Sequence, residues 1–229
     1  MLDKLARVNE DSFMVMPMPS TEEPTSQAGD RRRQRVLDAA LDLFSERTWE
    51  GTNVPQIAER AGVAVGTIYR YFENKEALGS AVYTEAKRAF AEMTVTTQVR
   101  QAEPLQALRL VWRGQLAFAM AYPEAFAFLE HQQHAGYLNS DALAVAGQLN
   151  ADLCSIIRAG QAAGVVREGD PKVLLAMVYG AFVGVTRLAR ALAVPLEEFD
   201  CTGIERAASA LLGLPETTLS TENPAVTGM

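Results

Sequence analysis

Two short helices joined by a tight turn are predicted by a single stretch, TNVPQIAERAGVAVGTIYRYF, and this pair limits what the chain can fold into more than any other feature. Asn53 is a suitable N-cap, and Gln56 stands three residues later, as in a capping box. Gly62 can end the helix in a left-handed conformation. The pattern predicts helices over residues 54–61 and 65–72, which together form a helix-turn-helix.

The second of these helices has an inner and an outer face. Ile68 and Phe72 are four residues apart, so we expect both to pack against the first helix. The remaining side chains are then left at the flank or facing outward: Gly66, Thr67, Tyr69, Arg70 and Tyr71.

These outer residue types suit a DNA groove. A glycine allows close approach of the backbone, hydroxyls can bond phosphates, and Arg70 can reach a guanine edge with two hydrogen bonds. Lys75, just after the helix, is placed for a further phosphate. The alternative is that Tyr69 and Tyr71 merely pack as half-buried aromatics; the surrounding helix-turn-helix favours the DNA-reading hypothesis.

A basic amphipathic helix is predicted over residues 31–47. It begins with Arg31, Arg32 and Arg33, and these arginines either form a solvated helix start or reach DNA phosphates. Residues 1–29 lack a helical period and hold several prolines, which is typical of a flexible arm.

Charge is unevenly distributed along the chain. The formal net charge is −7, yet residues 30–75 carry eight Lys/Arg and seven Asp/Glu, so the excess of acid lies elsewhere. We therefore expect a polyanion to dock on that segment alone.

The run RVLDAALDLFSERTWEGTNVPQIAERAGVAVGTIYRYFENKEAL resembles the N-terminal DNA-binding domain of the TetR family of bacterial transcriptional regulators. Three positions depart from the family pattern: Thr48 replaces a glycine, Asn53 a threonine, and Ala64 the serine that caps the recognition helix. The resemblance implies operator contacts from Thr52, Asn53, Val65, Gly66, Thr67, Tyr69, Arg70 and Tyr71, followed by Lys75.

The rest of the chain also reads as helical. Apolar periodicity and prolines predict five helices with both ends marked, over residues 75–98, 104–122, 140–163, 171–193 and 202–212. They predict one more helix that begins at Pro123. The fold class is therefore all-α with about nine helices: an arm (1–29), a DNA-binding domain (30–78), an effector-binding and dimerisation domain (79–214) and a flexible tail (215–229).

Gly180 and Gly184 form a GxxxG pattern on a helix that is apolar on most sides. They indicate either close packing within one bundle or a dimer interface, which the TetR family builds from its last two helices. We favour the interface, with Arg187 and Leu188 in it.

The effector site is poorly marked by the sequence. Candidate lining residues, each of which could equally be core, are Trp112, Leu116, Met120, Phe126, Leu129, Leu153 and Met177, with His131 and His134 as polar handles. An effector bound there would be a small, apolar molecule. The alternatives are a metal or redox sensor using those histidines or Cys154 and Cys201, and a helical enzyme.

The leading hypothesis is a homodimeric repressor that binds double-stranded, palindromic operator DNA and is released by its effector. No catalytic motif, metal ligand set or cofactor fingerprint was found, so we expect neither an enzyme nor a cofactor. The longest apolar run, from Val173 to Thr186, is short for a bilayer, and the two cysteines lie far apart. We therefore expect no membrane segment and a cytoplasmic location.

Overall fold

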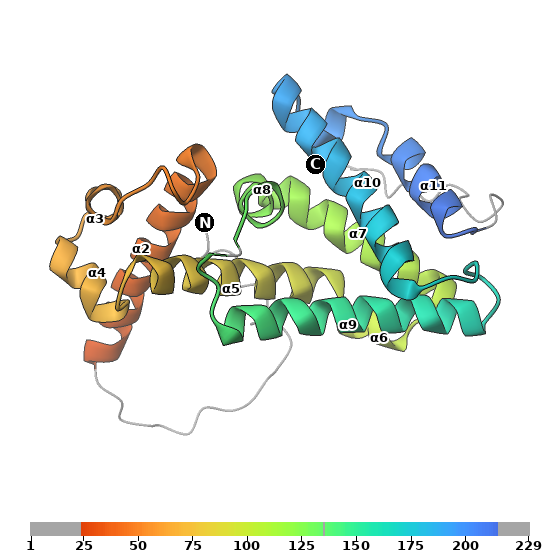
Figure 1. Ribbon diagram of the computed structural model, residues 1–229, viewed down its shortest axis with the longest axis horizontal. Helices are drawn as coiled ribbons and strands as arrows, with labels where there is room; N and C mark the ends of the chain where they lie inside the picture. Colours follow the sequence, from red (N-terminus) through yellow and green to blue (C-terminus); the bar gives the residue numbers. More distant parts are fainter. Residues whose placement is uncertain (1–23, 135, 215–229) are drawn as a thin grey trace, which may run out of the picture. The chain divides into compact units, whose positions relative to one another are not determined.

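The computed structural model describes residues 24–134 and 136–214, and within these ranges the chain is helical with no strand (Figure 1). This confirms the predicted all-α class. The predicted tail and most of the predicted arm lie outside the described residues.

The described ranges contain ten α-helices and one short 3-10 helix, where about nine helices were expected. They are α2 (Pro24–Arg47), α3 (Val54–Ala61), α4 (Val65–Tyr71), α5 (Lys75–Thr94), α6 (Thr97–Gln101), α7 (Pro104–Ala121), α8 (Pro123–His131), α9 (Ser140–Ala162), α10 (Pro171–Leu192), η2 (Leu196–Glu198) and α11 (Cys201–Leu211).

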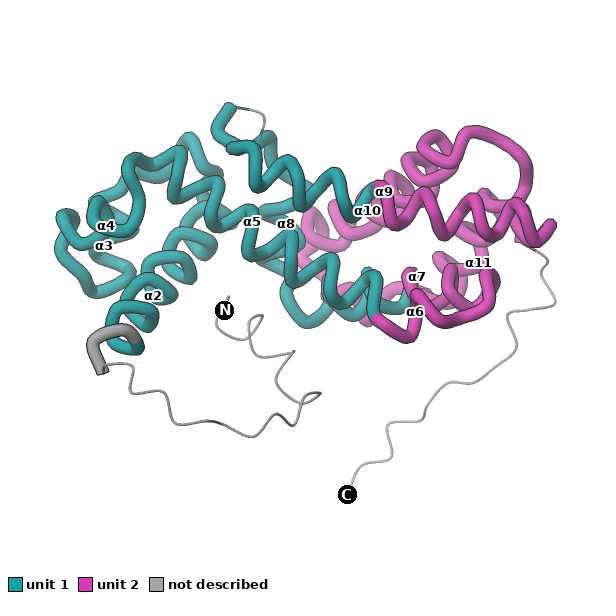
Figure 2. The backbone as a smooth tube through the Cα atoms, turned by 90° about the horizontal axis from the view of Figure 1, so that it is seen from below, with its two compact units in different colours: residues 1–96, 113–150 teal, residues 97–112, 151–229 magenta. Residues whose placement is uncertain are grey.

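The chain divides into two compact units (Figure 2). The first holds the chain up to Thr96 together with Arg113–Asn150, and the second holds Thr97–Trp112 together with the chain from Ala151 onward. The first unit therefore includes α2 to α5 and α8, and the second includes α6, α10 and α11. The division falls within α7 and α9.

Helix α3 forms as its local signals predict. The Asn53 side chain accepts a hydrogen bond from the Gln56 amide at 3.0 Å, and the Gln56 side chain accepts one from the Asn53 amide at 3.0 Å. Gly62 ends the helix with φ 64° and ψ 43°. Each of these signals acts within one helical turn, so the sequence places both ends of the helix.

Helix α2 begins at Pro24, earlier than the predicted start at Arg31. Between Gln27 and Arg35 no residue is buried, whereas Val36 and Leu37 are fully buried. The extra turns therefore carry no apolar period, which is the signal on which the predicted start relied. They are instead contacted by α4, because the Tyr71 hydroxyl donates a hydrogen bond to the Gly29 carbonyl at 3.1 Å.

The single helix predicted over 75–98 is two helices. Helix α5 ends at Thr94, and Val95 leaves the helical region with φ −118° and ψ 66° before α6 begins at Thr97. Four β-branched residues in a row, Thr94 to Thr97, occupy this break. Their restricted χ1 angles lower helix propensity, which explains the interruption.

The turn after α2 contains a strained residue. Thr48 has φ 66°, the left-handed region that non-glycine residues rarely adopt. Its amide donates a hydrogen bond to the Phe44 carbonyl at 3.0 Å. Thr48 thus occupies the conformation that would favour the glycine expected there from the TetR resemblance.

Aromatic residues form much of the core of the first unit. Phe44 of α2 stacks on Phe128 of α8 with 5.8 Å between ring centroids. Phe90 of α5 meets Phe118 and Phe126 edge-on at 5.1 and 6.0 Å. All five rings are nearly inaccessible to solvent. One aromatic pair thus joins α2 to α8, and a second group joins α5 to α7 and α8.

The second unit has its own core, made of Ile157, Val166, Leu174 and Leu212. Helix α10 supplies Leu174 and packs against α11. By length and composition α10 would pass as a membrane-spanning helix, as core helices of soluble proteins also do. The prediction of no membrane segment remains a prediction.

Candidate nucleic-acid interface

Helix α4 presents an open face to solvent. Ile68 and Phe72 are buried, as predicted, while Tyr69 is 51% exposed and Arg70 is exposed beside it. Gly66 and Val65 are also exposed. The predicted inner face is therefore present, and Gly66, Tyr69 and Arg70 form the exposed part of the predicted outer face.

Gly66 faces open space. A Cβ atom added at this position would meet no heavy atom within 4 Å among the described residues. Its backbone conformation is ordinary helix, so neither packing nor strain within the chain requires a glycine here. Nothing within the described chain requires glycine here, and the open backbone would let another molecule approach closely.

Helix α4 begins without a side-chain cap. Ala64 occupies the N-cap position with φ −71° and ψ 147°, and no side chain accepts a hydrogen bond from the first turn. The Thr67 amide instead donates a hydrogen bond to the Ala64 carbonyl at 2.8 Å. The lack of a side-chain cap agrees with the departure from the family pattern at Ala64.

Tyr71 differs from its predicted orientation. It is half-buried, its ring lies near that of Phe72, and its hydroxyl is bonded to Gly29. The Arg70 guanidinium carbon lies 5.7 Å from the centre of its ring. Tyr71 therefore anchors α4 to the start of α2, which corrects its assignment as an outward-facing residue; Thr67 is also half-buried.

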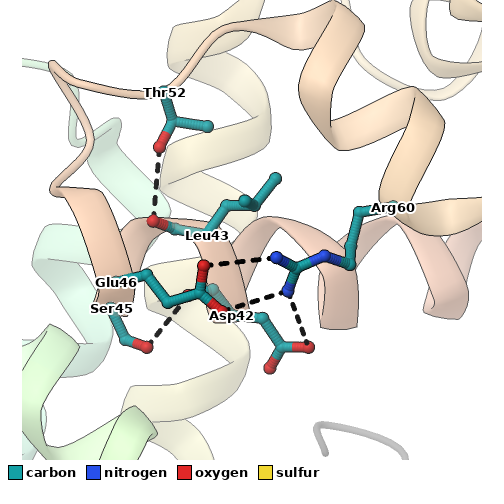
Figure 3. Close-up of polar contacts among 6 residues, drawn as sticks. All are labelled: Asp42, Leu43, Ser45, Glu46, Thr52 and Arg60. Atoms are coloured by element: carbon teal, nitrogen blue, oxygen red, sulfur yellow. Dashed lines mark hydrogen bonds and ion pairs between the residues drawn. The ribbon is translucent and has the colours of Figure 1, made fainter.

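Thr52 is buried, with 3% of its surface exposed. Its hydroxyl lies 2.9 Å from the Thr48 carbonyl oxygen. The Leu43 carbonyl oxygen is 3.3 Å away (Figure 3). The hydroxyl therefore stabilises the turn between α2 and α3, and the operator contact that the resemblance implies for Thr52 stays a prediction. Asn53 is exposed, but its side-chain oxygen caps α3.

Arg60 is a basic residue whose role the sequence did not reveal. Its two terminal nitrogens each lie 3.2 Å from one carboxylate oxygen of Glu46, and Asp42 is 4.0 Å away (Figure 3). This bidentate pair ties α3 to α2 at the surface. Arg60 is thus engaged within the protein although it lies in the segment predicted to meet DNA.

The three arginines at positions 31 to 33 do not behave alike. Arg31 and Arg32 are exposed, in agreement with a role at phosphates. Arg33 is ion-paired with Glu85 of α5 at 2.8 Å, and its guanidinium lies 5.5 Å from the centre of the Phe72 ring. Arg33 therefore packs between α2 and α5 beside Phe72, and the phosphate contact predicted for it stays a prediction.

Lys75 lies at the start of α5 against an aromatic ring. Its Nζ is 4.1 Å from the centre of the Trp49 ring, a cation–π geometry. Partial burial lowers the pKa of its ammonium group, whereas the neighbouring carboxylates of Glu76 and Glu50 raise it by a smaller amount. The predicted phosphate contact from Lys75 would have to be made from this position.

His134 is fully used inside the first unit. Its Nε2 lies 2.7 Å from the Phe128 carbonyl, which can only accept, so Nε2 carries the hydrogen. Its Nδ1 then accepts from the Tyr137 hydroxyl at 2.5 Å. Burial lowers the pKa of His134, so the neutral ring is favoured. The structure gives His134 an internal role in place of the predicted ligand contact.

The metal and redox alternatives find no support in the described residues. No group of three or more His, Cys, Asp or Glu side chains there could hold a metal ion. Cys154 is buried, and Cys201 directs its sulfur toward the Leu196 carbonyl at 3.6 Å. Burial raises the pKa of the Cys201 thiol, which disfavours the reactive thiolate.

The predicted effector residues are distributed over both units. Trp112 and Leu153 are buried in the second unit, and Phe126 and Leu129 are buried in the first. Leu116, Met120 and His131 are half-buried in the first unit.

Helix α10 carries an exposed apolar stripe, which we define as Val173, Met177, Gly180, Gly184 and Leu188. All five are exposed, and their spacing of three or four residues places them on one helical face. A Cβ at either glycine would meet no heavy atom within 4 Å, so the glycines are not explained by packing within the described chain. Met177 lies on this exposed stripe, and its predicted role in an effector cavity stays a prediction.

Two family models match consecutive parts of the chain. Residues 36–82 match the model of bacterial regulatory proteins of the tetR family. Residues 83–208 match the model of the tetracyclin repressor-like C-terminal domain. Together they extend from α2 into α11.

Curated relatives are transcription regulators. The HTH-type transcriptional regulator RutR of Escherichia coli O157:H7 is 31% identical over 170 residues, which are 68% of this chain and 74% of that protein. The HTH-type transcriptional repressor KstR of Mycobacterium tuberculosis is 37% identical over 101 residues, 44% of this chain and 46% of that protein.

Solved structures have the same fold. A tetR family transcription regulator from Shewanella sp. PV-4 has a TM-score of 0.65 and 26% identity, covering 79% of this chain and 95% of that one. The regulator FadR from Bacillus subtilis, solved in complex with stearoyl-CoA, has a TM-score of 0.65 at 23% identity, covering 78% of this chain and 96% of that one.

Proposed function

Because the chain belongs to the TetR family of bacterial transcriptional regulators, we propose that it is a homodimeric repressor that reads its operator with α4 and leaves it when a small molecule binds the C-terminal helices. Residues 30–78 are the DNA-binding domain and residues 79–214 the effector and dimer domain. The protein acts in the cytoplasm, where its operator lies, and it has no catalytic role.

The exposed face of α4 is the observation that carries this proposal. Gly66 leaves the backbone open, and Tyr69 and Arg70 project a hydroxyl and a guanidinium into solvent. The uncapped first turn, after Ala64, offers amide donors to a phosphate. These groups supply both kinds of contact that a recognition helix makes, namely positioning contacts to the backbone and a fork for a base edge.

The basic residues near α4 divide into two groups. Arg33 and Arg60 are engaged in ion pairs within the protein. Arg31 and Arg32 are exposed at the N-terminal part of α2, whose Gly29 is bonded to α4 through Tyr71. We therefore assign the phosphate contacts to Arg31 and Arg32, with Lys75 at the other end of α4.

Dimerisation follows from the geometry of operator DNA and from the α10 stripe. Two recognition helices must reach half-sites about 34 Å apart, which one copy of α4 does not do. The α10 stripe is exposed, apolar and interrupted by two glycines that allow close approach of a second helix. Burial of this stripe against a second copy gives the symmetric pair that a palindromic operator requires.

Release from DNA follows from linkage. The dimer has one state in which the two α4 helices fit the operator half-sites and one in which their spacing does not fit. An effector that binds the second state more tightly lowers operator affinity, at most by the ratio of its affinities for the two states. A solved structure of the same fold, FadR from Bacillus subtilis, is a complex with stearoyl-CoA, a molecule that joins a long apolar chain to an anionic carrier.

The test is operator binding by an Arg70→Ala variant. Binding sites are first mapped by selecting genomic DNA fragments with the purified dimer, and affinity is then measured by gel shift at fixed salt. Loss of a bidentate contact to guanine costs about 1–3 kcal/mol, or roughly 10- to 100-fold in affinity.

Arg158→Ala is the matched control, because Arg158 is an exposed arginine of α9, far along the chain from α4. It should bind like the unaltered protein. Equal affinity of all three proteins would remove α4 as the reading helix.

A further inference from the structure

Two buried hydrogen-bond donors on α7 have no acceptor within the described residues. They are Nη2 of Arg109 and Nε1 of Trp112. Trp112 is only 6% exposed, and both residues belong to the second unit. Being three residues apart on one helix, they share a face of α7.

Such an arrangement is costly for a protein to keep. A buried donor without an acceptor loses its hydrogen bond to water and gains none in return, which destabilises the fold, and more so when the group is charged. Tryptophan can only donate, and arginine carries five donors and no acceptor, so neither residue can satisfy the other. What the pair lacks is an acceptor, and because Arg109 is cationic an anionic acceptor forms the stronger bond.

Aromatic rings pack around Trp112. Trp112 meets Phe182 of α10 edge-on with 5.3 Å between ring centroids, and Phe182 is buried. The ring of Tyr179 lies 6.4 Å from that of Phe182. A molecule that reaches the two donors therefore meets aromatic carbon as well.

We propose that Arg109 and Trp112 bind the carboxylate of an effector whose body is apolar, so that the effector is an organic acid. This rests on the proposed function, in which an effector binds the C-terminal helices, and it names the chemical class of that effector. One positive charge and two donors match a carboxylate, which has one negative charge and two oxygens. A phosphate dianion would bring a second charge and a third oxygen for which the pair has no partner.

The test follows the indole signal of Trp112. The chain has two tryptophans, so a Trp49→Phe variant leaves one indole N–H resonance in a ¹H–¹⁵N NMR spectrum and assigns it. The full-length protein is titrated with acetate, octanoate, decanoate and 4-phenylbutyrate, and with 1-octanol, 1-decanol and 4-phenylbutanol as neutral partners of the same shape.

At least one longer acid should move the Trp112 indole signal and bind at least tenfold more tightly than its alcohol. Arg109→Gln should remove that preference for the acid, while Arg113→Gln, at an exposed arginine of the same helix, should keep it. If Arg109→Gln does not fold, the preference for the acid over its alcohol is measured in Trp112→Phe instead. Binding is then monitored by the rise in melting temperature that the acid causes. The inference is overturned if no acid shifts the signal, or if acid and alcohol bind equally.

Operator binding separates this inference from the proposed function. A protein that binds its operator but no acid remains a repressor with another effector class. A protein that binds decanoate through Arg109 but no DNA keeps the acid site and loses the proposed function.

Discussion

The indole ring of Trp49 stacks on the phenol ring of Tyr137, with 4.6 Å between centroids and 17° between planes. Trp49 follows α2, and Tyr137 precedes α9. Nearby, the Gln132 side-chain amide donates a hydrogen bond to the Phe44 carbonyl at 2.6 Å. The segment between α8 and α9 is thereby held against α2 and the turn that follows it. The Lys75 ammonium group lies over the same Trp49 ring.

Replacing Gly79 by alanine should destabilise this contact. A Cβ there would lie 2.8 Å from Nε1 of Trp49 and 3.0 Å from a ring carbon of Tyr137, both parts of packed rings. Overpacking of this kind costs about 1–3 kcal/mol. Urea unfolding of Gly79→Ala should show that loss, and an unchanged midpoint would mean that the two rings can separate freely.

Replacing Gly66 by alanine should have the opposite effect on stability. Nothing lies within 4 Å of the added methyl, and alanine is favoured over glycine in a helix by about 1 kcal/mol, so the free energy of unfolding should rise. Operator affinity should nevertheless fall roughly tenfold, about 1.4 kcal/mol, because the methyl holds the backbone away from DNA. Unaltered affinity in a gel shift at fixed salt would show that DNA does not approach this residue.

Giving α4 the cap it lacks should stabilise the protein. Ala64 has the extended backbone of an N-cap and no capping side chain, so Ala64→Ser should add about 1 kcal/mol to the free energy of unfolding. Urea denaturation measures this. Ala64→Val, which has no oxygen to accept from the first turn, is the control and should give no such gain.

Stability should fall with pH below neutrality because of His134. Burial lowers the pKa of His134 in the folded chain, and the charge of Lys87 lowers it further, whereas Glu130 raises it. As the pH falls, the histidine is therefore protonated at a higher pH in the unfolded chain than in the folded chain. The stabilisation is complete above the ordinary histidine pKa of about 6.5 and is lost as pH falls through the lower folded value.

The comparison is the slope of unfolding free energy between pH 7.5 and 5.5. His134→Gln should flatten it, whereas His131→Gln, at the other histidine of the chain, should not. A slope that survives in His134→Gln would assign the effect to other groups.

A charge on the α10 stripe should separate the dimer. Leu188 is exposed at the stripe, so Leu188→Glu should shift sedimentation toward the monomer at micromolar concentration. Leu143→Glu makes the same change at another exposed leucine, on α9, and should remain dimeric. A monomeric unaltered protein would contradict the proposed homodimer. A dimeric Leu188→Glu variant would place the interface elsewhere.

The local sequence was sufficient for much of the helix-turn-helix. Asn53, Gln56 and Gly62 place both ends of α3, and the spacing of Ile68 and Phe72 gives the inner face of α4. The sequence also identified Ala64 as an N-cap residue whose side chain cannot accept a capping hydrogen bond. In each case the interacting groups are within four residues, where a helix fixes their relative positions.

The contacts that the sequence did not reveal join residues far apart along the chain. Tyr71 was expected to face DNA and instead reaches Gly29, and Arg33 reaches Glu85. His134 was a candidate ligand contact and is instead held by Tyr137 and by the Phe128 carbonyl. Residue type alone does not separate an exposed tyrosine or arginine from an anchored one.

The sequence by itself thus determined the all-helical class, the family and the register of the two short helices, because periodicity and caps act within a turn or two. Only the tertiary structure decided which polar groups remain available. In the folded chain the Thr52 hydroxyl is buried, and Arg33 and His134 are bonded to other residues. Gly66 and the α10 stripe remain exposed. The buried donors of Arg109 and Trp112 have no acceptor within the described residues. Whether a polar side chain can bind another molecule depends on its neighbours in space, and the packing of distant chain segments determines those neighbours.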